Sequence, residues 1–157
     1  MQRRILFICS LFLFISCEKR EPEKVRLLEF KMNSQFVSVE GHAECYNEIK
    51  NRKSIGYEWK VYNVGSNTLD IDAYDSTRIK RVFTFPEFRA KYMLEISAGQ
   101  LITYHATEGK FRLLAPREGD ATGDFHFKMK NIANPNDSIM IENGYFRIWL
   151  DKYDREF

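Results

Sequence analysis

The chain has 157 residues, of which 24 are lysine or arginine and 22 are aspartate or glutamate, so its formal net charge is +2. This length suits one domain that buries about two-thirds of the surface of its unfolded chain. The near balance of charge gives no support for nucleic acid binding, which typically needs a basic face.

The first 16 residues have the pattern of an export signal. Arg3 and Arg4 precede an apolar run from Ile5 to Ile15, and about eleven residues are too few for a bilayer-spanning helix, which needs roughly 20. We therefore expect residues 1–16 to be a secretory signal peptide. Its removal leaves 22 basic and 22 acidic residues, a formal charge of zero.

The apolar run ends at Phe14-Ile15-Ser16-Cys17, and the next residues are nearly all charged. This tetrapeptide resembles the lipobox of bacterial lipoproteins, in which Leu usually stands in place of Phe14 and a small residue in place of Ile15. The resemblance implies a diacylglyceryl thioether on Cys17, usually with an added N-acyl chain. Two or more chains give stable attachment to a membrane, here the outer membrane of a bacterial envelope. The alternative is an ordinary secreted protein.

The charged stretch after the cysteine, EKREPEK, contains proline and has nothing to bury. We expect residues 17–24 to be a lipidated cysteine with a charged tether, and residues 25–157 to be the folded domain. Such a tether resembles the export tether of surface lipoproteins in Bacteroidota. The outer membrane is the expected location, while the sequence leaves open which membrane carries the anchor and whether the domain lies on the periplasmic or the surface face.

The three cysteines predict a domain without an intramolecular disulfide. Cys9 leaves with the signal peptide and Cys17 carries the lipid, so Cys45 stands alone. A lone thiol in an oxidising envelope is expected to be buried. Burial of a core must therefore hold the domain together.

Apolar and polar residues alternate along most of the domain, as in Tyr57–Val61 and Phe125–Met129. This period of two is typical of half-buried antiparallel strands. About ten strands are expected, at the spacing of a sandwich or a closed sheet. The eleven candidate segments are Val25–Phe30, Phe36–Val39, Tyr57–Tyr62, Leu69–Ala73, Arg78–Phe85, Tyr92–Ser97, Leu101–Ala106, Phe111–Leu114, Phe125–Lys130, Ile139–Glu142 and Tyr145–Leu150.

Two short helical turns are expected between these strands. One begins at Pro86 and continues through Phe88–Met93, because Pro-Glu suits a first helical turn; the other lies in Glu44–Lys53. The phrases YEWKVYNVGSNTLDI and ISAGQLITYHA resemble immunoglobulin-like modules of envelope proteins. The predicted fold is a single all-β antiparallel sandwich, immunoglobulin-like or transthyretin-like.

The last two strands are predicted to form a tight hairpin. Asn143-Gly144 lies between Ser138–Glu142 and Tyr145–Trp149, and Asn-Gly supplies both positive-φ positions of a type I′ turn. In this register Ile141 lies opposite Phe146 on the core face.

The other face of the same hairpin is the candidate partner-binding surface. It consists of Tyr145, Arg147 and Trp149, with Met140 predicted opposite Arg147. Tyrosine, arginine and tryptophan are enriched in binding hot spots. If this ridge is exposed, it would suit a protein partner or a sugar ring. The alternative is that other parts of the domain cover the ridge.

Metal sites find weaker support. Asp70, Asp72 and Asp75 could bind calcium, which takes six to eight oxygen ligands, but no EF-hand pattern follows, and the polar half of a strand explains them more simply. His42 and Cys45 provide only two of the four ligands that zinc needs. A buried thiol beside a surface imidazole is the favoured interpretation.

No catalytic motif is present: we find no Gly-x-Ser-x-Gly elbow, no cysteine with a basic neighbour and no glycine-rich phosphate loop. We therefore expect a membrane-anchored, non-enzymatic module that binds or assembles with an envelope protein, without a cofactor beyond the covalent lipid. The alternatives are a glycan- or metal-binding envelope domain, which could be hydrolytic, and a purely structural spacer.

Overall fold

The structure, a computed structural model, describes residues 24–76, 81–117 and 119–157. All regular structure in this part of the chain is β-strand, which confirms the all-β prediction. The nine strands are β1 (Arg26–Met32), β2 (Gln35–Lys50), β3 (Lys53–Asn63), β4 (Thr68–Asp75), β5 (Val82–Thr84), β6 (Phe88–Ser97), β7 (Gln100–Arg117), β8 (Asp120–Asn131) and β9 (Ser138–Glu156).

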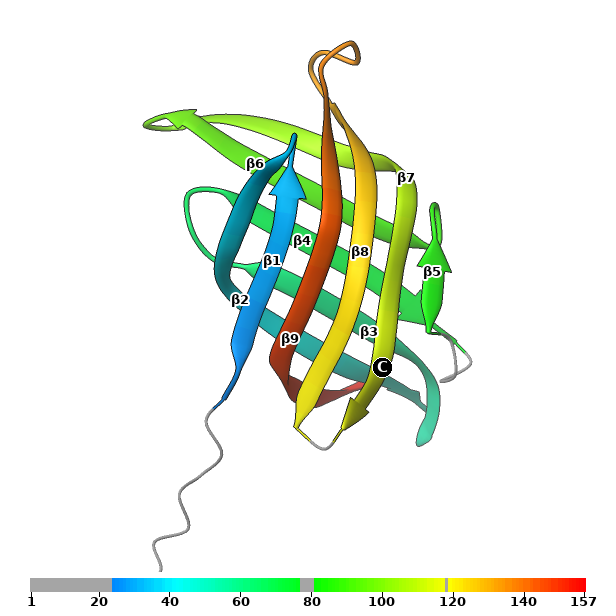
Figure 1. Cartoon of the computed structure of the whole chain (residues 1–157). Helices are drawn as coiled ribbons and strands as arrows, with labels where there is room; N and C mark the ends of the chain where they lie inside the picture. The colour runs from blue at the N-terminus through cyan, green and yellow to red at the C-terminus, as the bar shows by residue number, and fades with distance from the viewer. Residues whose placement is uncertain (1–23, 77–80, 118) are drawn as a thin grey trace, which may run out of the picture.

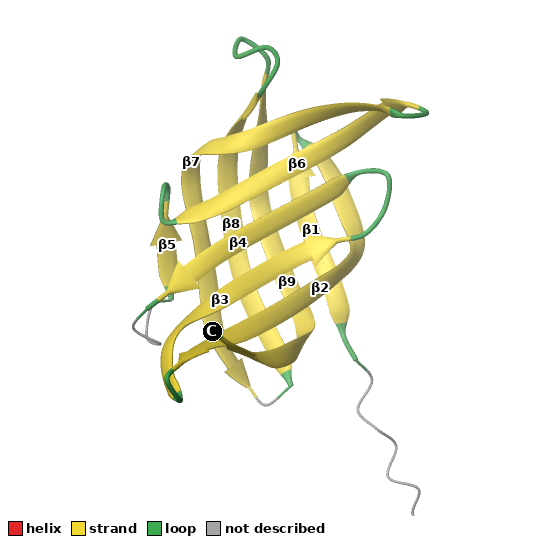
Figure 2. Ribbon diagram, turned by 180° about the vertical axis from the view of Figure 1, so that it is seen from behind, coloured by secondary structure: helices red, strands yellow, loops and turns green. Residues whose placement is uncertain are grey.

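The nine strands form one sheet in the order β5-β7-β6-β4-β3-β2-β1-β9-β8, and a further pairing of β7 with β8 closes it. Strands β1, β8 and β9 face β3, β4 and β6 across the core, as in a sandwich, while the long strands β2 and β7 bend from one layer into the other (Figures 1 and 2). Neighbours pair antiparallel, with one exception: the end of β9 runs parallel to β2. Because β2 and β7 belong to both layers, the layers form one continuous sheet, whereas an open sandwich has two separate sheets.

Aromatic side chains fill the space between the layers. The largest fully buried side chains include seven phenylalanines, namely Phe30, Phe83, Phe88, Phe111, Phe125, Phe127 and Phe146. Ring centroids of Phe125 and Phe127 lie 5.3 Å apart and those of Phe111 and Phe146 lie 5.7 Å apart. Each such side chain contributes roughly 1.5–3 kcal/mol by leaving water. Cys45 is buried on the inner face of β2 and free, as expected.

Asn143-Gly144 does not form the predicted hairpin, because both residues lie inside the continuous strand β9. Asn143 has a φ of 51°, and the register of β9 shifts beside it against both neighbouring strands. Such a bulge inserts one extra residue. Ile141 and Phe146 therefore both face the core, as predicted, although they pair with other strands rather than with each other.

The two predicted helical turns are also wrong. Pro86 lies in a turn that the amide of Glu87 closes by donating to the carbonyl of Thr84 at 2.7 Å, and β6 begins at the next residue. Residues 44–50 belong to β2, where polar side chains face outward while Ala43 and Cys45 face the core. Their alternation is hard to see in the sequence because the inner residues are small.

Several predicted strands merge into longer ones. The two segments expected on either side of Gly109 form the single strand β7, in which this glycine has a φ of 139°. A Cβ at this position would lie 2.2 Å from the carbonyl oxygen of His126, so the residue permits close contact with β8. Of the strand expected at residues 78–85, residues 78–80 lie outside the described part of the chain, and β5 begins at Val82.

Four of the described connections between strands lie at the same end of the molecule (Figure 1). Residues 33–34, 64–67, 98–99 and 132–137 lie at one end, which we call the distal end, while β1 begins at the opposite end (Figure 1). No helix formed by the described residues is long and apolar enough to cross a membrane.

Candidate functional site

The predicted ridge lies on the outer face of β9. Tyr145 and Arg147 are exposed and Trp149 is half-buried, so the sheet does not cover the ridge. Arg147 donates from Nε and Nη2 to Asp120 Oδ2, both at 3.1 Å. Met140 is exposed too, but it pairs with Lys128 and does not lie opposite Arg147, because the hairpin behind that expectation is not formed.

The three aspartates of β4 do not converge. Asp70 and Asp72 point outward, whereas Asp75 is buried on the inner face. Within the described ranges, no group of three or more histidine, cysteine, aspartate or glutamate side chains could hold a metal ion. The structure therefore does not bring Asp70, Asp72 and Asp75 together as a calcium site.

His42 and Cys45 lie on opposite faces of β2, since they are three positions apart on one strand and successive side chains alternate between its faces. The ring of His42 stacks on Tyr62, with centroids 5.3 Å apart. Burial raises the pKa of the Cys45 thiol to about 11. The imidazole therefore cannot join the thiol in a metal site.

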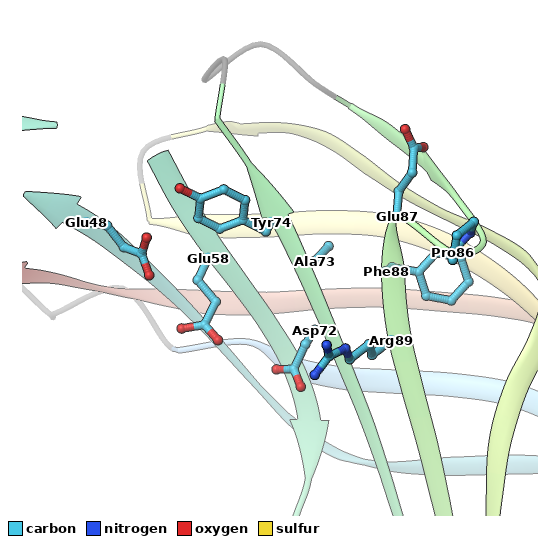
Figure 3. Close-up of a pocket in the computed structure, with 9 residues that line it drawn as sticks. All are labelled: Glu48, Glu58, Asp72, Ala73, Tyr74, Pro86, Glu87, Phe88 and Arg89. Carbon is cyan, nitrogen blue, oxygen red and sulfur yellow. The ribbon is translucent and has the colours of Figure 1, made fainter. Parts of the chain in front are cut away.

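A groove that the sequence did not predict crosses the outer face of β3, β4 and β6. It consists of three hollows of about 270, 380 and 310 Å³. The first two share Asp72 and Arg89, and the second and third share Asp70. Figure 3 shows the first hollow, with Asp72 and Arg89 close together. We call this continuous depression the outer groove.

Cross-strand pairing brings opposite charges together in the outer groove. Asp72 lies between Lys60 on β3 and Arg89 on β6. Asp70 lies beside Lys91, which in turn pairs with His105 on β7. Opposite charges on neighbouring strands stabilise a sheet by roughly 0.2–1 kcal/mol per pair.

These ion pairs are looser than hydrogen bonds. Lys60 Nζ lies 3.8 Å from Asp72 Oδ1 and Lys91 Nζ lies 3.7 Å from Asp70 Oδ2. Burial, reinforced by the neighbouring carboxylate of Asp70, raises the pKa of Asp72. The groove thus holds donors and acceptors side by side without joining them directly.

A network of aromatic and charged side chains borders the groove. The hydroxyls of Tyr46 and Tyr62 both donate to Glu44, at 2.6 and 2.9 Å. Arg155, from the end of β9, lies 3.5 Å above the Tyr46 ring and donates to Glu58 at 2.6 Å. Burial and the bond to Glu44 raise the pKa of Tyr62 to about 12. This network fixes the wall of the groove.

The distal end carries apolar side chains that are 57 to 73% exposed. They are Phe36, Val64, Ile96, Leu101 and Ile132. Leu101 and Ile132 line a further hollow of about 310 Å³, and the amide of Ile132 donates to the carbonyl of Thr103 at 3.0 Å. Asp137 is the one charged residue in the four distal connections, and it accepts bonds from Tyr104 and Asn131.

No protein-family model matches this sequence, and comparison with curated proteins and with solved structures finds no significant match.

Proposed function

We propose that the chain is a lipid-anchored protein of a bacterial cell envelope whose β-domain is a non-enzymatic module that docks onto another envelope protein. The sequence around Cys17 supports the lipid anchor in the outer membrane, on its periplasmic or surface face. No cofactor beyond this lipid is part of the proposal.

The apolar distal end is the observation that carries this proposal. Depletion of charged residues is the compositional signal of the central part of a protein interface, and contiguous exposed apolar surface marks interaction sites. The distal connections contain a single charged residue, and Leu101 and Ile132, both more than half exposed, border one hollow there. The ridge of Tyr145, Arg147 and Trp149 offers a second contact surface on the side of the domain.

The placement of the distal end fits an anchored protein. The described chain begins at the opposite end of the molecule (Figure 1). A tether of residues 17–24 attached to a membrane would therefore leave the distal end pointing away from that membrane, where a partner can reach it.

Gentle crosslinking and pull-down of the full-length protein from its native envelope tests the proposal. We expect one recurrent partner, lost in Cys17→Ser and in the double variant Leu101→Ser with Ile132→Ser. The matched control is Ile55→Ser with Val82→Ser, which alters two apolar side chains that are each 43% exposed and lie away from the distal end. Equal loss in the control would refute a distal docking surface, and loss only in Trp149→Ala would move the site to the ridge.

A further inference from the structure

We infer that the outer groove binds an uncharged oligosaccharide. This inference is independent of the protein docking proposed for the distal end, because the two surfaces share no residue. It rests on the hydrogen-bonding groups, the charges and the exposed rings of the groove.

Two buried polar atoms in the groove lack a hydrogen-bond partner. They are Thr68 Oγ1 and Asp72 Oδ1, and they are the only such side-chain atoms in the described part of the chain. Both belong to β4, and each lines the groove. Buried polar groups are nearly always hydrogen-bonded in folded proteins. Both lie on one strand that lines one depression, so unused hydrogen-bonding capacity is concentrated beside the groove.

The spacing of the charged groups suits hydroxyl groups. The pairs Lys60–Asp72 and Lys91–Asp70, at 3.8 and 3.7 Å, are too long for direct hydrogen bonds. A hydroxyl oxygen can lie about 2.8 Å from both members of such a pair. It can donate to the carboxylate and accept from the ammonium, because a hydroxyl does both. Adjacent hydroxyls of a sugar ring present this chemistry repeatedly.

The charge of the groove argues against an acidic ligand. In the central hollow Asp70 and Asp72 are balanced by Arg89 and Lys91, so an ionised ligand gains little there. In the first hollow carboxylates outnumber the single arginine, which disfavours uronic or sulfated sugars. An uncharged ligand needs no net charge in the central hollow and is not repelled by the carboxylates of the first hollow.

Two exposed rings border the groove. Phe85 lines the central hollow and Tyr74 the first hollow, and they are 42% and 45% exposed. Flat rings of this kind provide apolar surface on which the C–H face of a sugar ring can pack. The groove follows β4 from Thr68 to Tyr74, about 20 Å at roughly 3.3 Å per residue, which is room for several sugar rings.

Titration of the full-length lipidated protein, held in a zwitterionic detergent, tests the inference by calorimetry. The probes are uncharged oligosaccharides of β-glucan, α-glucan, xylan and mannan, with oligogalacturonate and a lysine-rich peptide as the charged alternatives. We expect saturable binding of at least one uncharged probe. Asp72→Asn and Thr68→Val should each weaken it by about tenfold, the effect of losing one well-made hydrogen bond.

Matched controls lie on the opposite layer. Asp124→Asn changes a carboxylate whose side-chain exposure of 40% is close to the 38% of Asp72, and Thr122→Val changes a half-buried threonine of β8. Both should bind as the wild type does. Chemical shifts perturbed by the sugar in the wild type should map to β4 and β6, which tests the site without any substitution.

Several results would overturn the inference. They are the absence of binding by every uncharged probe, binding unchanged in Asp72→Asn, or perturbed shifts away from β4 and β6. Preference for the lysine-rich peptide would make the groove a peptide site. The distal variants Leu101→Ser and Ile132→Ser should bind sugar normally even if they lose the protein partner, so the two proposals can fail separately.

Discussion

Substitution of Gly144 by alanine tests the packing of β9 against the core. The Cβ of alanine would lie 2.3, 2.4 and 2.6 Å from three ring carbons of Phe125, whereas carbon atoms in contact lie about 3.5–4.0 Å apart. The ring cannot move away freely, because it is buried and packs on Phe127 and Phe30. Overpacking of this kind costs about 1–3 kcal/mol, and we expect about 2 kcal/mol for Gly144→Ala.

A double-mutant cycle identifies the cause of this loss. Phe125→Val removes the three clashing carbons and costs about 2–4 kcal/mol by itself, because it leaves a cavity. If the clash explains the cost of Gly144→Ala, the double variant should be about as stable as Phe125→Val alone, a coupling of about 2 kcal/mol. Urea unfolding, followed by circular dichroism, provides the free energies of unfolding.

The control is Gly99→Ala in the turn between β6 and β7. Gly99 has a φ of 81° and nothing lies within 4 Å of the added Cβ, so alanine there costs backbone strain of about 1 kcal/mol and should not couple to Phe125. A coupling below about 0.5 kcal/mol at Gly144 would refute the packing argument. It would favour a turn at Asn143-Gly144, where alanine is strained whatever residue 125 is.

Three further results are expected. In a chain expressed from residue 17 with Cys17→Ser, the Cys45 thiol should react with a disulfide reagent at pH 8 about a hundredfold more slowly when folded than in urea, since burial raises its pKa from 9.0 to about 11; rapid reaction of the folded protein would contradict its burial. Arg155→Ala removes the contacts of this side chain with Tyr46 and Glu58, so it should destabilise the domain by about 1 kcal/mol and speed hydrogen exchange in residues 150–156. Arg147→Ala should change stability by less than about 0.5 kcal/mol, because its ion pair is exposed. Equal effects of the two substitutions would show that Arg155 has no special role in stability. The raised pKa of Asp72 means that the folded state binds the proton of this carboxyl group more tightly than the unfolded state does, so the stability of the wild type falls as pH rises from the unfolded pKa through the folded one. Asp72→Asn should therefore raise the free energy of unfolding, relative to the wild type, more at pH 7 than at pH 4. A stability difference that becomes smaller as pH rises would show that the pKa shift has the opposite sign.

Alternation in the sequence predicts most of the strands but not how long they are. Phe125, Phe127 and Met129 face the core as their spacing predicts. Gly109 suggests a break, yet the structure uses this glycine for close contact between two paired strands. Asn143-Gly144 suits a turn, but a single positive-φ residue also suits a bulge. Local chemistry permits both structures, and only the pairing of β9 with β1 and β8 decides between them.

The outer groove was beyond prediction for a related reason. The sequence places Asp70 and Asp72 on the polar face of one strand, which the structure confirms. Their partners Lys60, Arg89 and Lys91 belong to the polar faces of two other strands. Which cation meets which carboxylate depends on the register between strands, and alternation alone does not encode it.

Closure of the sheet depends on β9. β9 pairs with β1 and β8, and its end pairs with β2, so a chain that stops before residue 138 leaves three strands with open edges. Open edges invite pairing with other chains, and contacts between distant parts of a sequence form slowly. β9 is therefore the closing strand: truncation that removes residues 138–156 would leave the edges of β1, β2 and β8 open to pairing with other chains.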